Sequence, residues 1–294
     1  MPQTRTDPYA APREVDCRVD LHLHSSESDG LLTPAAVVEA AVERGLAAIA
    51  LTDHDTVSGL AEAAAAARSA GLDLAPGIEM SLYDGAGSTH MLGYFIDAQH
   101  DGLLEFLAAA RESRARRAEE MVRKLNRLGI DLALDAVLAQ VAESGLVARP
   151  HVARALIDGG WVKSFGEAFD RFIAAGSPAY VPTRTVAPDE GIRLIHAAGG
   201  LAVLAHGGRT HDDDRIYELV DAGLDGLEVL HPDHGPAEVR RMRRVAAELG
   251  LVETGGSDWH GPLDTRRDRL GAQPVPHAWF ERLREAAGAA PAAT

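Results

Sequence analysis

Two histidines stand on one short apolar run near the start of the chain, in VDLHLHSSESDG (residues 19–30), and an aspartate follows them closely. In an extended strand, residues two apart point to the same side, so His22 and His24 project together. Two imidazoles with a nearby carboxylate, Asp29, form a set of side chains that can bind a metal ion. Taken alone, the stretch is equally compatible with two histidines that are hydrogen-bonded within a strand.

The same kinds of side chain close or follow other apolar runs, at AIALTDH, LAPGIE, LAVLAH and LVETGGSDWH. All strand C-termini of a parallel barrel lie on one face, where active sites are built. His90 is the exception because it begins its run, THMLGYF, and it reaches that face only on an antiparallel or displaced strand. The candidate metal ligands are His22, His24, Asp29, His54, Glu79, His90, His206, Asp258 and His260.

The size of this set indicates more than one ion. A catalytic zinc takes about three protein ligands, so nine candidates predict two or three divalent ions. Three carboxylates offset only part of the charge of such a group of ions, and the remaining positive charge suits a phosphate or a bridging hydroxide. Mixed imidazole and carboxylate ligands fit manganese, zinc or iron. We expect manganese first, with zinc or iron as alternatives.

Short apolar runs alternate with helical patterns along most of the chain, which is typical of an α/β fold with a parallel sheet. Seven expected strands fit a (β/α) barrel smaller than the eight-stranded kind. The alternation breaks between Asp97 and Pro188, where several helical patterns follow one another. The expected organisation is an N-terminal tail (1–16), a barrel (17–96 and 188–285), a helical insertion that covers the site (97–187) and a C-terminal tail (286–294).

Composition limits the partners. The formal net charge of −15 argues against binding of long duplex nucleic acid or of an anionic membrane surface, but not against a small phosphorylated substrate. Cys17 is the only cysteine, which excludes an intramolecular disulfide and favours a reducing, cytoplasmic setting. No stretch is long and apolar enough to span a membrane. The sequence gives no prediction of oligomeric state.

Six separated motifs carry a family resemblance: DLHLHSSESDG, LTDHDTVSG, GIEMS, HMLGYF, LAHGG and GGSDWHG, in this order. They resemble the motifs of the PHP (polymerase and histidinol phosphatase) family over about Val19 to Gly271. The resemblance implies a distorted seven-stranded barrel, a trinuclear metal site and hydrolysis of phosphoesters. It implies the same nine ligands, His90 included.

Within the family, ARPHVARAL (148–156) and the inserted helices are similar to a stand-alone branch. That branch includes nucleoside 3′,5′-bisphosphate phosphatases, AMP-type phosphatases and 5′→3′ exonucleases of short RNA. The implied function is a metal-dependent phosphoesterase acting on small nucleotides or very short oligonucleotides. The alternatives are a hydrolase of histidinol phosphate, a sugar phosphate or a cyclic ribose phosphate, and a non-catalytic metal-binding regulatory module. The complete set of nine ligands argues against the last alternative.

Cationic side chains are the candidate substrate contacts. Arg114 and Arg117 fall on the apolar stripe of the helix expected over 103–129, where an arginine needs an anion. Buried salt bridges, or snorkelling to the surface, would explain them equally well. Arg149 and His151 flank Pro150 at an expected helix N-terminus, which favours a phosphate. A solvated arginine beside a simple helix cap is the alternative.

Two histidines are the candidate catalytic groups in a metal-assisted hydrolysis without a covalent intermediate. His206 belongs to the ligand set, and His231 follows another strand end as a substrate contact or proton donor. Asp20 and Asp53, each close to a candidate ligand, could orient imidazoles or be ordinary strand-end polar groups.

Overall fold

The computed structural model describes residues 18–83, 87–141, 146–182, 186–262 and 270–288. Cys17, the expected tail 1–16 and residues 289–294 of the expected C-terminal tail lie outside the described residues. None of the helices in the described ranges has the length and apolar character needed to cross a bilayer.

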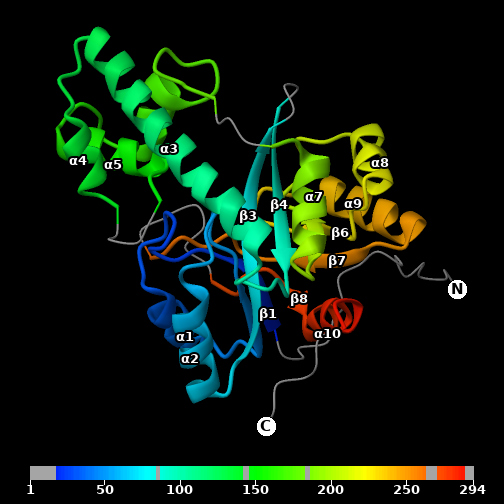
Figure 1. The fold of residues 1–294 in the computed structure, drawn as a ribbon. Coiled ribbons are helices and arrows are strands. Elements are labelled where there is room, and N and C mark those ends of the chain that lie inside the picture. The colour runs from blue at the N-terminus through cyan, green and yellow to red at the C-terminus, as the bar shows by residue number, and fades with distance from the viewer. Residues whose placement is uncertain (1–17, 84–86, 142–145, 183–185, 263–269, 289–294) are drawn as a thin grey trace, which may run out of the picture.

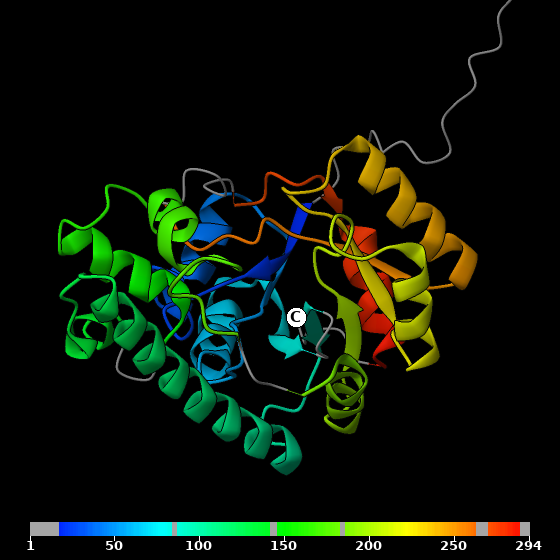
Figure 2. The same ribbon diagram turned by 90° about the horizontal axis from the view of Figure 1, so that it is seen from above.

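Within the described residues, eight strands form one sheet that curls into a nearly closed barrel (Figures 1 and 2). The strands are β1 (Arg18–Leu23), β2 (Ala48–Leu51), β3 (Asp73–Tyr83), β4 (Ser88–Tyr94), β5 (Leu201–Leu204), β6 (Gly226–Leu230), β7 (Val252–Gly255) and β8 (Val275–Pro276). Their order in the sheet is β7-β6-β5-β4-β3-β2-β1-β8. The ends of the barrel meet where Leu23 bridges Trp259, just beyond β7, and the backbone N–H of His24 donates to the Trp259 carbonyl over 3.0 Å. The predicted α/β fold, a distorted barrel of seven strands, is confirmed, with short β8 added antiparallel to β1.

Strand β4 departs from the parallel pattern. It pairs antiparallel with both β3 and β5, and His90 lies opposite Ser81 of β3. Because β4 runs antiparallel to β3, the start of β4 lies beside the C-terminal end of β3. His90 therefore reaches the functional face, as the antiparallel alternative required.

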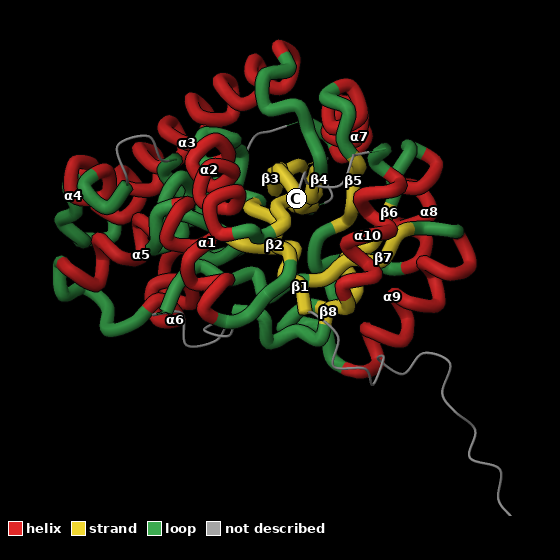
Figure 3. Tube along the Cα trace, turned by 90° about the horizontal axis from the view of Figure 1, so that it is seen from below, coloured by secondary structure: helices red, strands yellow, loops and turns green. Residues whose placement is uncertain are grey.

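In the part of the chain that the structure describes, six helices surround the barrel (Figure 3). They are α1 (Pro34–Glu43), α2 (Leu60–Ala70), α7 (Pro188–Ala197), α8 (Asp213–Asp221), α9 (Pro236–Leu249) and α10 (His277–Ala286). Helix α1 begins as its sequence predicts, because Thr33 Oγ1 accepts a hydrogen bond from the Ala36 N–H and Pro34 opens the first turn. Buried aliphatic side chains of strands and helices, among them Leu21, Ile78 and Val203, form one core.

The remaining helices stand to one side of the barrel in Figure 1. They are α3 (Asp101–Arg127), α4 (Leu134–Leu138), α5 (Arg149–Asp158), α6 (Phe165–Ala168) and the π-helical turn η1 (Phe169–Ile173). They share a second hydrophobic core, which includes Met121 and Leu156. Helix α3 joins the two cores, since Leu103 and Leu107 near its start pack in the barrel core. The insertion bounds 97–187 stay a prediction, which the separate core supports.

Candidate metal centre

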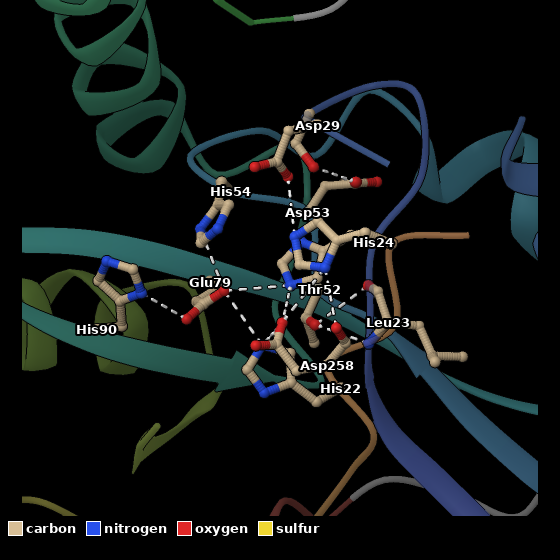
Figure 4. Close-up of polar contacts among 12 residues, drawn as sticks. His22, Leu23, His24, Asp29, Thr52, Asp53, His54, Glu79, His90 and Asp258 are labelled. Carbon is tan, nitrogen blue, oxygen red and sulfur yellow. Dashed lines mark hydrogen bonds and ion pairs between the residues drawn. The ribbon is translucent and has the colours of Figure 1, made fainter. Parts of the chain in front are cut away.

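Glu79 of β3 lies at the centre of a group of imidazoles (Figure 4). Its Oε2 lies 3.1 Å from His22 Nε2 and 3.1 Å from His54 Nδ1. Its Oε1 lies 2.7 Å from His90 Nδ1 and 3.0 Å from His206 Nε2. His24 Nε2 also lies 3.3 Å from Oε2, so Oε2 faces three histidines and Oε1 faces two. With its two oxygens facing different histidines, Glu79 could contribute a ligand atom to more than one ion.

Two aspartates complete the group. Asp258 Oδ1 lies 3.1 Å from His24 Nε2, and Asp29 Oδ1 lies 3.2 Å from His260 Nε2. Among the described residues, four overlapping sets of side chains have ligand atoms close enough to hold an ion, and one of them is His22, Glu228 and His231. The other three are His24, Asp29, His54 and His260; His22, His24, Glu79 and Asp258; and His54, Glu79 and His90. Together with His206, these are the nine candidates from the sequence, and we call them the histidine cluster.

Several polar atoms of the cluster are buried without a hydrogen-bond partner among the described residues. They are His24 Nδ1 and Nε2, Asp29 Oδ1 and His54 Nδ1. His24 Nε2 is close to Asp258 Oδ1, but the pair lacks the angles of a hydrogen bond. A buried polar atom without a partner costs folding free energy unless something else satisfies it. Imidazole nitrogens and carboxylate oxygens aimed at one point are satisfied by a divalent cation, so the residues present fit a metal site.

The titration behaviour of the cluster agrees with this fit. Burial lowers the pKa of His24, but Asp258 and Glu79 outweigh it and raise that pKa to about 10. Burial raises the pKa of Glu79, whereas the neighbouring histidines, His54 first, hold it well below its usual range. In the absence of a cation, a proton on His24 balances the charge of the neighbouring carboxylates, and a bound metal ion would displace that proton.

Strained backbone occurs at the loops that carry the cluster. Asp55, His206 and Asp258 adopt positive φ angles of 49°, 32° and 50°. Residues with a Cβ rarely adopt this conformation, so surrounding contacts must hold it. The Asp55 N–H donates to the Glu79 carbonyl over 3.0 Å, and the His206 N–H donates to Glu228 Oε2 over 2.7 Å.

Asp20 and Asp53 brace loops that carry residues of the cluster. Asp53 accepts hydrogen bonds from the backbone N–H and hydroxyl of Ser25 and from the Ser28 hydroxyl, over 2.6–2.7 Å. Asp20 accepts from the backbone N–H groups of Ser257 and Gly271 over 2.8 and 2.9 Å. These contacts support the alternative that the two carboxylates are ordinary strand-end polar groups, and orientation of imidazole rings stays a prediction. The two carboxylates fix the loops that carry Asp29 and Asp258.

Glu228 of β6 is a site residue that the sequence reading missed. It is fully buried, its Oε1 lies 2.9 Å from His22 Nδ1, and its Oε2 accepts from the His206 backbone. The available signal was its position inside the apolar strand GLEVL, where a carboxylate needs a partner.

The two predicted catalytic histidines differ in access. His206 is about a quarter exposed, while His231 is 1% exposed and lies behind Asp258. His231 Nδ1 accepts from the Asp233 N–H over 3.1 Å, so its proton is on Nε2, 3.3 Å from Asp258 Oδ2. That placement favours support of Asp258 over proton donation to a substrate, and the catalytic role of both histidines stays a prediction.

A cavity of about 200 Å³ opens beside His54 and His90. Its other walls include Arg114 and Arg117 of α3, Arg149 of α5 and Tyr180, and we call it the arginine pocket. His151 does not line it: the Ala148 N–H donates to its Nδ1 over 2.9 Å, so the ring closes the first turn of α5. The predicted substrate contact by His151 stays a prediction.

The three arginines have different partners. Arg114 donates to Asp55 Oδ2 from Nε over 2.8 Å and to Ser81 Oγ over 2.9 Å, so the buried salt-bridge alternative holds for it. Arg117 donates to the Val181 carbonyl over 2.7 Å. In the described part of the chain, neither Arg117 nor Arg149 is paired with a carboxylate.

Tyr180 lies between the two unpaired arginines, with its ring centroid 5.9 Å from the Arg117 guanidinium and 6.0 Å from that of Arg149. Burial, and then the charge of Arg149, lowers the pKa of Arg117 to about 9. Burial and the neighbouring guanidinium both disfavour the charge on Arg117, and a bound anion would favour it. Tyr180 was missed because nothing in the sequence around it marks a site.

Comparison with known proteins gives consistent results. The model for the PHP domain matches residues 20–146. The chain is 36% identical to the 3′,5′-nucleoside bisphosphate phosphatase of Chromobacterium violaceum over 255 residues, which is 85% of this chain and 90% of that protein. It is 35% identical to the 5′-3′ exoribonuclease Rnm of Escherichia coli, covering 83% of this chain and 85% of that one.

A solved structure agrees. A protein from Bifidobacterium adolescentis, described as a metal-dependent phosphoesterase, superposes with a TM-score of 0.86 at 34% identity, covering 94% of this chain and 98% of that one.

Proposed function

The chain belongs to the PHP domain family of metal-dependent phosphoesterases, and from that premise we propose that it removes phosphate from small nucleotides, namely nucleoside 3′,5′-bisphosphates or AMP-type substrates. One observation carries the proposal: His54 and His90 of the histidine cluster line the same cavity as Arg117 and Arg149, the two arginines that have no carboxylate partner among the described residues. A substrate with one phosphate at the cluster and a second anionic group at the arginines fits that arrangement.

The metal ligands in this proposal are the nine residues of the histidine cluster, holding two or three divalent ions. Manganese is the expected metal, with zinc or iron as alternatives. Bound divalent ions supply a hydroxide near neutral pH and offset the negative charge of the phosphate.

The residues of the chain divide the remaining work. His54, His90 and His206 are the partly exposed members around Glu79, so the phosphate to be cleaved approaches on their side. Arg149 and Arg117 bind the second phosphate and thereby fix the distance between it and the scissile ester. Arg114, already paired with Asp55, positions α3 in place of a direct substrate contact.

The net charge of −15 and the small cavity favour a mononucleotide or very short oligonucleotide, and we expect action in the cytoplasm. The similarity to an exoribonuclease supports a second activity on short RNA in the 5′→3′ direction. A 5′-phosphorylated RNA and a nucleoside 3′,5′-bisphosphate share a 5′-phosphate one nucleoside away from a 3′-phosphoester. One site can therefore accept both.

The test is phosphate release, with manganese supplied, from 3′-phosphoadenosine 5′-phosphate, AMP, histidinol phosphate and a 5′-phosphorylated trinucleotide. We expect the bisphosphate or trinucleotide to be preferred, with activity lost on chelation and restored by metal. Preference for histidinol phosphate would retain the metal centre but overturn the nucleotide assignment. Bound metal without hydrolysis of any ester would favour a binding or regulatory role.

A further inference from the structure

Glu228 joins two parts of the histidine cluster that are far apart in the sequence. It projects from β6 and contacts the His22 side chain from β1 on one oxygen and the backbone of His206, after β5, on the other. Of the carboxylates outside the cluster in the described residues, Glu228 alone hydrogen-bonds an imidazole ring of the cluster.

The contact decides which nitrogen of His22 faces the other ligands. A carboxylate can only accept, so the proton of a neutral His22 ring is on Nδ1. Its Nε2 hydrogen-bonds Glu79 Oε2 over 3.1 Å and lies 3.5 Å from Asp258 Oδ1, so a metal ion held by those carboxylates would take the place of a proton on Nε2. A ring that keeps its proton on Nδ1, toward Glu228, offers Nε2 to a metal ion.

The second contact acts on the backbone. His206 has a positive φ of 32°, and its N–H donates to Glu228 Oε2 over 2.7 Å. This bond helps to hold a conformation that a residue with a Cβ rarely adopts. The His206 ring then reaches Glu79 Oε1 at 3.0 Å.

We propose that Glu228 is a positioning residue that sets the tautomer of His22 and the backbone of His206, and thereby the metal affinity of the site. The inference rests on the metal centre of the proposed function. Asp20 and Asp53 provide the contrast, because their hydrogen bonds reach backbone and hydroxyl groups and fix loops. Partners of this kind typically change metal affinity by about 10- to 100-fold when removed.

The sharpest variant is Glu228→Gln. Its amide has one acceptor and one donor group, whereas both existing contacts need an acceptor. The His206 N–H cannot change its role, but His22 can move its proton to Nε2 and accept at Nδ1. That change would direct an N–H at the metal position. The matched control is Glu253→Gln on β7, where Glu253 pairs with Arg243 away from the cluster.

The measurement is a titration of each metal-free protein with Mn²⁺, following free Mn²⁺ by electron paramagnetic resonance. We expect the affinity of Glu228→Gln to fall about 10- to 100-fold and the control to match the unaltered protein. Equal affinity in all three proteins would overturn the inference and leave the proposed function intact. An unaltered protein that binds no Mn²⁺ would overturn both.

A second measurement does not depend on the variant folding. In the unaltered protein loaded with Zn²⁺, nitrogen-15 spectra of histidine should show His22 with its proton on Nδ1 and the bound nitrogen at Nε2. A His22 protonated on Nε2 would contradict the proposal directly.

Discussion

The histidine cluster borders the arginine pocket, but the side chains of the two regions are held in place by different interactions. The cluster stands on strand ends of a closed barrel, and buried carboxylates hold its loops at several points. The pocket wall comes from α3, α5 and the segment that carries Tyr180, which share a separate hydrophobic core. In the cluster, imidazoles lie against carboxylates, while in the pocket two guanidinium groups each lie about 6 Å from the centroid of one aromatic ring.

The contrast separates two tasks. The cluster is arranged to keep a fixed geometry around metal ions, which hydrolysis requires. The pocket holds an excess of like charge that a substrate anion would neutralise. Variants of the histidine cluster should therefore lose turnover, whereas variants of the arginine pocket should lose substrate affinity.

Replacement of Glu79 by glutamine should have the largest effect. The amide of glutamine cannot offer two charged oxygens to the surrounding histidines and their metal ions. We therefore expect kcat to fall a thousandfold or more, which corresponds to an activation free energy higher by roughly 4 kcal/mol. Metal content after dialysis and phosphate release measure it. The exposed variant Glu248→Gln, which loses only a surface pair with Arg244, should keep full activity. Activity within tenfold of normal for Glu79→Gln would separate the cluster from the reaction.

Replacement of Arg114 by alanine should mainly affect stability. Asp55 would be left buried without its charged partner, and breaking such a pair lowers the unfolding free energy by about 3–5 kcal/mol. Arg116→Ala, two residues along the same helix and 69% exposed, should lose less than about 1 kcal/mol. Urea unfolding at pH 7 compares them. Equal small losses would show that α3 is not anchored through Asp55.

Replacement of Arg149 by alanine should alter substrate affinity alone. Loss of a charge-assisted contact predicts a KM for the bisphosphate about 10- to 100-fold higher. The kcat for p-nitrophenyl phosphate, which has no second phosphate, should not change. Arg154→Ala, on the same helix but stacked on Phe165, is the control. A fall in kcat with unchanged KM would place Arg149 with the cluster instead.

Replacement of Arg117 by methionine should have the smallest effect, and it should be a gain. The pKa of Arg117 lies at about 9, below the usual 12.5, because burial and Arg149 disfavour the charged form. For a base with a lowered pKa in the folded state, stability is reduced at every pH below about 9 and recovers as pH rises toward 12.5. We therefore expect the metal-free variant to be about 1 kcal/mol more stable at pH 7 by thermal unfolding. It should also bind the bisphosphate more weakly, and a destabilised variant would contradict the excess of charge.

The same division explains what the sequence could predict. The cluster residues other than His90 stand out because they lie at or after strand ends that converge on one face. The direction of β4 needed the structure, since a short apolar run does not show its orientation. Glu228 was hidden inside a strand, and its partners His22 and His206 are remote in sequence.

The pocket was less predictable for a physical reason. Arginine on an apolar helical stripe indicates a need for an anion but not which anion. Arg114 forms an ion pair with Asp55, whereas Arg117 contacts a backbone carbonyl and has no carboxylate partner among the described residues. Only three-dimensional packing distinguishes them.

Helix α3 makes the width of the pocket sensitive to small rotations. It is one continuous helix of 27 residues, about 40 Å long, and Arg114 lies at its midpoint. The contact between Arg114 and Asp55 thus lies about 20 Å from each end of the helix. A tilt of roughly 10° about that point would move each end of the helix by about 3.5 Å, which is more than the length of a hydrogen bond.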